Sequence, residues 1–418
     1  MIKAKQRHVI SLFSGAGGLD YGLEAAGFDT AVCIEMDKHC CNTLRANRAW
    51  PVMEGMIEDF STDSILSAAS LKAGEAALLV GGPPCQPFSK SGYWKTGDAL
   101  RLNDPRANTL EEYMRVLEES LPYAFILENV YGLAYKGKDE GLLFLQERLD
   151  RINKGKKTHY SFTWKVLNAA NFGVPQVRER VFIVGCREGK AFQFPQPLYG
   201  VGDESPNNDL FLTEDARCTW DAIGDLDDPD EKPFPSKVGG SWGDLLPSIP
   251  EGKNYLWHTN RGGGKDLFGW RTRYWSFLLK LSKELPSWTI QAQPGTAIGP
   301  FHWKNRRLTM REMARLQTFP DNVQVLGGNS NIQRQIGNAV PSLLAEILGR
   351  SLMMQFFESP IEGSLTLLPP RRRPIPKAED LFPVPSRYKP VPISERAKRE
   401  ERLEPRQPVY EGSAGTAK

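Results

Sequence analysis

Apolar and polar residues alternate along the first 185 residues in the order that β–α units produce. Short apolar runs predict strands, and the amphipathic stretches between them predict helices packed on a mainly parallel sheet. A helix is predicted from Leu19 to Ala26, where Gly27 ends it. The predicted strands are "HVISLF" (8–13), "TAVCIE" (30–35), "AALLVGG" (76–82), "YAFILENV" (123–130) and "ERVFIVG" (179–185). The pattern therefore predicts an α/β fold with a doubly wound, mainly parallel sheet.

The hydrophobic pattern changes between residues 186 and 306. Seven of the ten tryptophans lie in this segment, and long helical periodicity is mostly missing, which predicts a separate, loop-rich inserted domain. Helical patterns return at "LTMREMARLQTF" (308–319) and "SLLAEILGRSLMMQF" (342–356). The second pattern has an apolar face that needs a partner, and we expect it to pack on the N-terminal sheet. The predicted first domain is therefore discontinuous, comprising residues 1–185 and 307–358 on either side of the insert at 186–306.

The composition is typical of a soluble globular protein with room for two domains: the 418 residues are 40% hydrophobic and 25% charged. The start, "MIKAKQRHVISLF", has too short an apolar run for a signal peptide, and no run is long enough to cross a bilayer. Six cysteines without framework spacing favour a reducing compartment. Cys40 and Cys41 are adjacent and no CxxC pair accompanies them, so no metal site is expected. We expect a cytoplasmic monomer.

The segment 359–418 is basic and rich in proline. From residue 371 onward it has twelve lysines and arginines against seven acidic residues, and ten prolines lie between residues 369 and 408. Proline removes backbone donors that helices and central strands need, so we predict a disordered extension. Such a segment either attracts phosphates weakly or is only a solvated tail, and its composition favours the tail.

A glycine loop, "FSGAGG" (13–18), lies between the first predicted strand and helix. Gly15, Gly17 and Gly18 would let backbone approach a ligand closely, although their spacing differs from the GxGxxG of dinucleotide-binding proteins. Glu35 ends the next strand, where an acidic side chain reaches ribose hydroxyls in doubly wound sheets. The alternative is a tight turn with an incidental acid.

The candidate nucleophile is Cys85 in "LLVGGPPCQPFS" (78–89), at the carboxyl edge of the sheet where such folds place active sites. Pro84 and the proline after Gln86 restrict the turn, and the polar loop that follows would close over a substrate. A buried structural cysteine is the commoner alternative. A core position would not be followed by "QPFSKSGYWKTGD", so a reactive thiol is favoured.

Polar residues follow two other predicted strands. Glu128 ends an apolar strand, where burial would raise its pKa toward that of a usable acid, and Asn129 lies beside it. Arg178 and Arg180 lie two residues apart, so they would share one face of a strand and anchor a carboxylate, carbonyl oxygen or phosphate. A turn-capping glutamate and a surface arginine pair are the alternatives.

Together, in this order, the motifs resemble those of the bacterial and phage C5-cytosine-specific DNA methyltransferases. The resemblance spans residues 8–350, with the family's variable target-recognition domain between "QVRER" and "RRLT". It implies the Rossmann-like fold of methyltransferases that use S-adenosylmethionine. The motifs that carry it are "FSGAGG", "GGPPCQPFS", "ENV", "QVRERVFIVG", "RRLTMREMARLQTFPD" and "QIGNAVP".

The resemblance implies that Cys85 attacks C6 of a flipped-out cytosine and that C5 then takes the methyl group of S-adenosylmethionine. Glu128 would hydrogen-bond N3 and the exocyclic amine, Arg180 would contact the ring oxygen, and Arg178 would orient Glu128. Pro84, Gln86 and Asn129 complete the implied catalytic set, and Ser89 belongs to the loop that closes behind the base. The implied cofactor residues are Phe13, Gly15, Gly17, Gly18, Glu35, Met36, Ile57 and Asn338.

One motif departs from the family. Relatives usually carry Gly-Asp-Ile after the second strand, with the aspartate on the adenine amine, whereas this chain reads "EGMIEDF". Met56 occupies the position of that aspartate. Either Asp59 substitutes for it or the contact is absent, while the Ile57 backbone N–H remains for the adenine ring.

The insert favours DNA as the substrate, because reading a duplex sequence needs side chains aimed at base edges. The stretch "NRGGGKDLFGWRTRYWSF" (260–277) offers Arg261, Lys265, Arg271 and Arg273 as DNA contacts, and its aromatic residues are expected mainly as core. The expected partners are double-stranded DNA in the nucleoid and, where the enzyme belongs to a restriction–modification system, an endonuclease for the same site.

Three other functions fit parts of the sequence. A tRNA methyltransferase shares most of the motifs, and only the long insert argues against it. A catalytically silent DNA-binding protein would have lost Cys85, Glu128 or the glycine loop, and this chain retains all three. An NAD-dependent enzyme is disfavoured by the glycine spacing.

Overall fold

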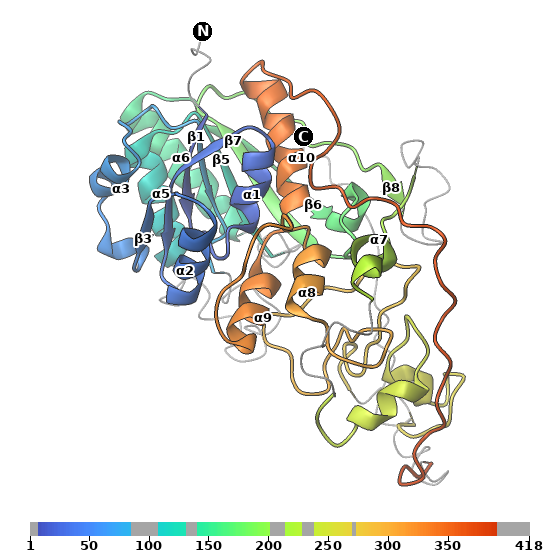
Figure 1. The fold of residues 1–418 in the computed structure, drawn as a ribbon. Coiled ribbons are helices and arrows are strands. Elements are labelled where there is room, and N and C mark those ends of the chain that lie inside the picture. The colour runs from blue at the N-terminus through green and yellow to red at the C-terminus, as the bar shows by residue number, and fades with distance from the viewer. Residues whose placement is uncertain are drawn as a thin grey trace.

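The structure is a computed structural model that describes residues 7–84, 108–130, 140–200, 214–227, 238–269 and 273–390. Its largest element is a seven-stranded sheet with the order β3-β2-β1-β4-β5-β7-β6 (Figure 1). The neighbours from β3 to β5 pair in parallel, and β7 runs antiparallel to both β5 and β6. The predicted α/β fold with a mainly parallel sheet is thereby confirmed. The strands are β1 His8–Leu12, β2 Asp29–Glu35, β3 Val52–Glu54, β4 Leu78–Gly81, β5 Ala124–Asn129, β6 Ser161–Asn168 and β7 Glu179–Cys186.

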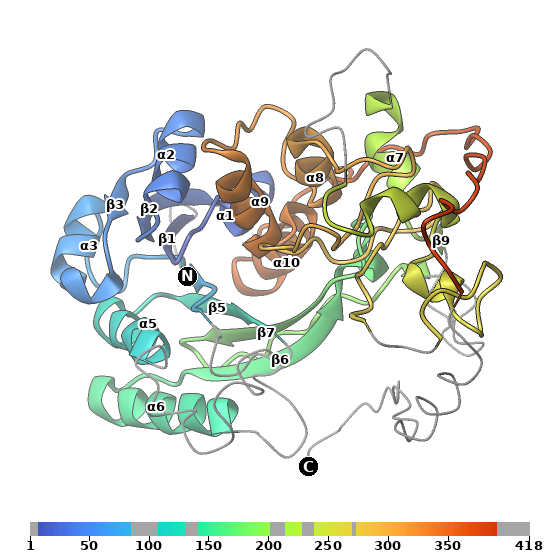
Figure 2. The ribbon, with the colours of Figure 1, turned by 90° about the horizontal axis from the view of Figure 1, so that it is seen from below.

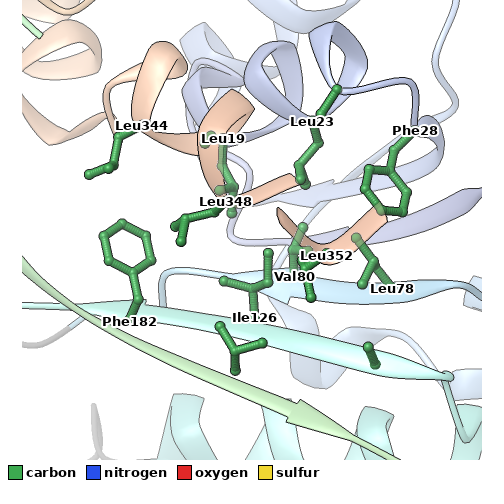
Figure 3. Packing of buried hydrophobic residues seen from close by; sticks show 14 of the residues in the cluster. Leu19, Leu23, Phe28, Leu78, Val80, Ile126, Phe182, Leu344, Leu348 and Leu352 are labelled. Carbon is green, nitrogen blue, oxygen red and sulfur yellow. The ribbon is translucent and has the colours of Figure 1, made fainter. Parts of the chain in front are cut away.

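Helices cover both faces of the sheet because successive strand residues point to opposite faces. Leu78 and Ile126 pack with α1 (Gly18–Ala25) and α10 (Ser342–Phe356) on one face (Figure 3). Leu79 and Leu127 pack on the other face, in a cluster with residues of three further helices (Figure 2). These are α3 Thr62–Ala68, α5 Asn108–Ser120 and α6 Glu140–Lys156, while α2 Lys38–Asn47 follows β2.

Beyond the sheet lie two smaller hydrophobic clusters. The middle cluster joins α7 (Thr219–Ile223), α8 (Met310–Leu316) and α9 (Asn329–Asn338) around the buried Trp303. The outer cluster is formed mainly by irregular chain, and we call residues 238–269 and 273–301 the outer lobe. A short two-stranded sheet, β8 Tyr199–Gly200 with β9 Glu214–Asp215, lies between the large sheet and α7 in the chain.

The tryptophans of this region divide into two groups. Trp220, Trp242, Trp257 and Trp303 pack in the hydrophobic clusters, as the sequence predicts for most of them. Three other aromatic side chains face outward: Tyr274 is 81% exposed, Trp275 43% and Trp288 36%.

The predicted disorder of the chain after residue 358 is wrong for residues 359–390. This segment is extended and runs from α10 to the outer lobe along one side of the protein (Figure 1). Leu367 packs against the sheet-side core, and the buried Tyr388 belongs to the outer cluster. The proline content excluded helix and sheet, but side-chain packing orders the segment without either. Residues 391–418 lie outside the described part of the chain.

Several chemical features can be excluded within the described residues. None of the described helices is long and apolar enough to cross a membrane. The same residues contain no group of three or more metal-ligating side chains. The five cysteines among them are all buried and unpaired.

Helices α1 and α10 approach each other so closely that Gly22 has no room for a side chain. A Cβ at Gly22 would lie 2.1 Å from the Ser342 carbonyl oxygen and 2.4 Å from Ala345 Cβ. We expect Gly22→Ala to lower the free energy of unfolding by about 1–3 kcal/mol, as other overpacked cores do. Gly155 in α6 is the matched control, because its Cβ would meet nothing within 4 Å. Gly155→Ala should leave stability unchanged or raise it by up to about 1 kcal/mol. Urea unfolding of both variants tests this, and equal effects would contradict the packing.

Candidate active site

The carboxyl ends of β4 and β5 form the centre of the candidate active site. The two strands are parallel neighbours with Gly81 opposite Leu127, so the residues after each emerge at the same edge. The Asn129 side chain links them, since its Nδ2 donates to the Pro83 carbonyl at 3.4 Å. Pro84 is the last described residue of this turn, and Cys85, Gln86 and Ser89 lie outside the described residues.

Glu128 is the buried carboxyl group at this edge. It is 9% exposed, and its Oε1 lies 3.0 Å from Arg180 Nε. Burial raises the pKa of Glu128, and the positive charges of Arg180 and Arg178 oppose that shift without cancelling it. The carboxyl therefore keeps its proton to a higher pH than a free glutamate and can donate a hydrogen bond as well as accept one.

Both arginines lie close enough to Glu128 to lower its pKa, and each makes a further contact of its own. Arg180, expected on the substrate, pairs with Glu128. Arg178, expected to orient Glu128, is completely buried and donates to the carbonyls of Gly337 at 2.8 Å and Ile290 at 3.5 Å. Because β7 begins at Glu179, Arg178 lies one residue before the strand. Arg178 therefore ties the start of β7 to α9.

Gly82 leaves the space that Glu128 occupies. A Cβ at Gly82 would lie 2.8 Å from Glu128 Oε2, which is closer than carbon and oxygen atoms approach without a shift. The glycine before the prolines thus serves the neighbouring carboxyl group as well as the turn.

The glycine loop lies beside this edge, between β1 and α1. Phe13, Gly15 and Gly17 all have positive φ angles, of 54°, 56° and 83°. Glu35, at the end of β2, accepts hydrogen bonds from the backbone N–H groups of Gly15 and Asp37, each at 2.8 Å. Burial raises the pKa of Glu35, and these two N–H groups act against the rise. The loop is therefore held to the second strand by a carboxyl group.

A chain turn from the far end of the sequence covers the start of α1. A Cβ at Gly18 would lie 2.4 Å from the Val340 carbonyl oxygen, so the turn after α9 packs directly on the glycine loop. Asn338, the last residue of α9, is exposed next to that turn. The structure thus places Asn338 near the glycine loop although more than 300 residues separate them in sequence.

Met36 follows β2, and Met56 and Ile57 follow β3. The resemblance implies that this region holds the adenine end of the cofactor. Met36 and Met56 are 65% and 51% exposed, whereas Ile57 is buried. The Asp59 carboxylate accepts a hydrogen bond from the Met56 backbone N–H at 3.1 Å. Asp59 therefore caps its own short helical turn, Ile57–Asp59, with one of its two oxygens.

Sequence reasoning missed a buried acid under the glycine loop. Asp20, in the first turn of α1, is completely buried, and burial raises its pKa to about 6 against a smaller opposing effect of the Ser11 hydroxyl. The Ser11 hydroxyl is itself 2.9 Å from that of Ser14 in the loop. The only sequence signal is an acidic residue inside an apolar, glycine-containing helix, "GGLDYGL".

Three of the candidate DNA contacts, Arg261, Lys265 and Arg273, lie in the outer lobe. Lys265 Nζ donates to the Tyr388 carbonyl at 3.0 Å, so this ammonium is engaged within the protein. The Arg273 guanidinium lies 5.4 Å from the centre of the Phe277 ring. Arg261 is exposed, and Arg271 lies outside the described residues.

A family model described as C-5 cytosine-specific DNA methylase matches residues 7–354. The chain belongs to this family. It is therefore a DNA cytosine-5-methyltransferase, and the predicted family and enzyme class are confirmed.

Two curated relatives are similar to this chain, one over most of its length and one over about half. The Type II methyltransferase M.SacI of Streptomyces achromogenes is 42% identical over 371 residues, covering 83% of this chain and 93% of that protein. The Type II methyltransferase M.AquIA of Picosynechococcus sp. is 47% identical over 209 residues, covering 49% of this chain and 82% of that protein. Both relatives are Type II methyltransferases by name.

Solved structures share the fold at lower identity. A putative DNA modification methyltransferase encoded within an E. coli prophage superimposes with a TM-score of 0.60 at 21% identity, covering 84% of this chain and 99% of that chain. The S. pombe Dnmt2 methyltransferase gives 0.54 at 15%, covering 84% and 98%.

Asp20 generates a pH-dependent prediction. A buried carboxyl with a raised pKa stabilises the fold while protonated, and that contribution is lost as the pH rises from about 4 to above 6. Asp20→Asn stays neutral, so we expect it to raise the unfolding free energy at pH 8 by up to about 3 kcal/mol and to have little effect at pH 4. Asp63→Asn, at an exposed position in the first turn of α3, is the control and should change stability by less than about 0.5 kcal/mol at either pH. Equal effects of Asp20→Asn at the two pH values would contradict the assignment.

Gly82 generates a catalytic prediction for the methyltransferase. The added Cβ of Gly82→Ala must displace the Glu128 carboxyl, and misplacement of a reacting group by about 1 Å costs about 100-fold in rate. We expect kcat to fall about 10- to 100-fold while the melting temperature changes little. Gly328→Ala, whose Cβ would meet nothing within 4 Å, should retain full kcat. Full activity of Gly82→Ala would show that the position of Glu128 does not limit the reaction.

Proposed function

We propose that this chain transfers a methyl group from S-adenosylmethionine to C5 of a flipped-out cytosine in a specific double-stranded DNA sequence. The reaction would pass through a covalent bond between Cys85 Sγ and C6 of the base. The observation that carries the proposal is the buried Glu128, paired with Arg180 at the sheet edge where the turn leading to Cys85 begins.

Glu128 suits a cytosine that is attacked at C6. Burial raises the pKa of Glu128, and in its protonated form the carboxyl would donate to N3 while its other oxygen accepts from the exocyclic amine. These contacts stabilise the electron density pushed into the ring as the thiolate of Cys85 bonds to C6. C5 then becomes nucleophilic enough to be methylated. Loss of the C5 proton with departure of Cys85 restores the aromatic ring and the enzyme, so one difficult step becomes several easier ones.

The residues around the glycine loop fit S-adenosylmethionine, which would supply an electrophilic methyl group on its sulfonium. Each Glu35 oxygen accepts one backbone N–H and keeps further acceptor capacity for a ribose hydroxyl. A Cβ at Gly15 would meet nothing within 4 Å, so space adjoins this carboxyl group. Phe13, Gly17, Met36, Ile57 and Asn338 would surround the remaining parts of the cofactor.

Double-stranded DNA is the proposed substrate because the relatives M.SacI and M.AquIA are Type II methyltransferases. A target cytosine is hidden in a duplex, so it must be flipped out to reach Glu128, and the loop with Ser89 would close behind it. The segment 186–306 would read the sequence, with Arg261, Arg271 and Arg273 as candidate contacts and Lys265 already bound to Tyr388. We further propose a cytoplasmic, nucleoid-associated monomer and an endonuclease for the same site.

Bisulfite sequencing of plasmid and host DNA tests the proposal. The wild-type chain, Cys85→Ser, Glu128→Gln and Glu179→Gln are expressed in a host without cytosine methylation. We expect the wild type to protect cytosines within one short sequence and Cys85→Ser to protect none. Glu128→Gln cannot supply the proton and should lower the rate about 100-fold or more. Glu179→Gln, an exposed carboxyl at the start of β7, should match the wild type.

Other outcomes would redirect the assignment. Unprotected DNA with methylated host tRNA would overturn the DNA proposal in favour of RNA. Protection by Cys85→Ser would overturn the role of the nucleophile.

A further inference from the structure

Residues 359–390, which we call the strap, pack against the sheet-side cluster near their start and the outer cluster near their end. The strap leaves α10 beside the sheet, passes α7 and ends on the outer lobe (Figure 1). The methylase family match ends at residue 354, so the strap lies beyond it. Its contacts fall at four anchor points.

The first anchor joins the strap to the sheet-side core. Leu365, Leu367 and Leu368 pack against the cluster that contains α1 and α10. The completely buried Glu346 of α10 accepts hydrogen bonds from the backbone N–H groups of Thr366 at 2.7 Å and Leu367 at 2.9 Å. A buried carboxylate thus holds the strap backbone in place.

The second anchor is a buried aspartate of α7. Asp221 of α7 is completely buried, and its Oδ1 accepts from the backbone N–H of Arg372 and from Arg373 Nη1, each at 2.9 Å. Arg371 Nη1 is 3.4 Å from the other oxygen. Although burial opposes ionisation, the N–H groups of Arg372 and Cys218 and the charge of Arg373 keep the pKa of Asp221 below its ordinary value. The guanidiniums of Arg371 and Arg373 and the backbone N–H of Arg372 therefore stabilise a buried carboxylate of their own protein.

The third anchor is a buried lysine at the border of the outer lobe. Lys283 is 1% exposed, and its ammonium binds Glu251 at 2.7 Å, Glu379 of the strap at 2.9 Å and the Lys377 carbonyl at 3.1 Å. A buried charge is stable only when it is paired and hydrogen-bonded. Two of these three acceptors, Glu379 and the Lys377 carbonyl, belong to the strap.

The fourth anchor is Tyr388, which is 7% exposed in the outer cluster. Its ring stacks on Trp242 with centroids 4.9 Å apart and an interplanar angle of 12°. Its hydroxyl donates to the Ser241 carbonyl at 2.8 Å and also contacts Asp244. Its carbonyl accepts from Lys265 at 3.0 Å. One continuous segment thus inserts side chains into the cores at both ends of the protein.

We propose that the strap positions the outer lobe for DNA reading, with Arg373 and Tyr388 as positioning residues. The inference rests on the proposed function, in which the outer lobe contacts the DNA sequence while Glu128 on the sheet receives the flipped base. The two tasks require a fixed separation, because a small displacement of the bound duplex misplaces the target base. A strap anchored in both cores supplies that constraint.

Kinetics of the full-length enzyme on plasmid DNA from a host without cytosine methylation test the proposal. We expect Tyr388→Ala, which loses the ring stack and hydroxyl contacts, to raise KM for DNA about tenfold, and Arg373→Gln to raise it several-fold. Tyr388→Phe keeps the stack on Trp242 and should stay within about threefold of the wild type. Phe382→Ala is the matched control, because this aromatic residue of the same strap is 61% exposed and should have no effect. KM for S-adenosylmethionine should stay within about twofold in every variant.

Hydrogen exchange measured on the same proteins separates the strap from the proposed function. We expect Tyr388→Ala to speed exchange in the outer lobe, at peptides covering residues 277–281 and 297–301, and not at β4. Unchanged exchange together with unchanged KM for DNA would overturn the proposed positioning role of the strap. Faster exchange with unchanged KM for DNA would instead overturn the assignment of DNA reading to the outer lobe. A parallel loss of affinity for S-adenosylmethionine would also overturn the proposal, since the strap would then stabilise the whole fold.

Discussion

The rest of the structure depends on the close contact between α1 and α10. Gly22 of α1 faces the backbone of residues 342–346, and a Cβ at Gly349 of α10 would lie 2.6 Å from Ala26 Cβ. Helices that touch at this distance exclude larger side chains at both positions. Through this contact α10 packs on the sheet although the inserted segment separates it from α1 in sequence. The turn at residues 338–340, which directly precedes α10, lies against the glycine loop. Because Arg178 binds the Gly337 carbonyl just before that turn, the start of β7 has the same support. The glycine loop and the start of β7 are therefore held by one packing contact.

Burial and nearby charges at the sheet edge together determine the pKa of the Glu128 carboxyl. Arg180 pairs directly with Glu128, while the buried guanidinium of Arg178 is held by carbonyl oxygens. A carboxylate flanked closely by two guanidiniums would normally have a depressed pKa, but burial of Glu128 outweighs them here. Arg180 thus holds the side chain in place while the pKa of the Glu128 carboxyl stays above its ordinary value. The position of the Glu128 carboxyl also explains the glycine at position 82, because a larger side chain there would occupy the space of the carboxyl group.

The sequence predicted the sheet well where apolar runs are continuous and poorly where strands are short or lie at an edge. Five strands were predicted to within one or two residues of their observed ends: β1, β2, β4, β5 and β7. Strands buried on both faces of a sheet are apolar throughout, which makes them easy to locate. β3 is only three residues long, and β6 is an antiparallel edge strand with exposed residues in the middle, so neither has a strong pattern. Glu128 was identifiable from its place after an apolar strand. The partners of Arg178 were not, because they lie more than 100 residues away and are backbone carbonyls that no sequence pattern marks.

The strap shows why composition misleads when order comes from scattered contacts. Ten prolines predict the absence of helix and sheet, which is correct for residues 359–390, but that absence is not disorder. Order here comes from apolar residues at both ends and from charges that face buried partners of opposite sign. Asp221 and Lys283 are buried in the described structure, and the strap supplies acceptors or donors to both. A buried ion that loses its partner is strongly destabilising, so these two residues make the folded outer region depend on a segment outside the family's shared domain. Several arginines of the strap pair with carboxylates of the same protein. The net positive charge of the strap is therefore weak evidence that it binds nucleic acid.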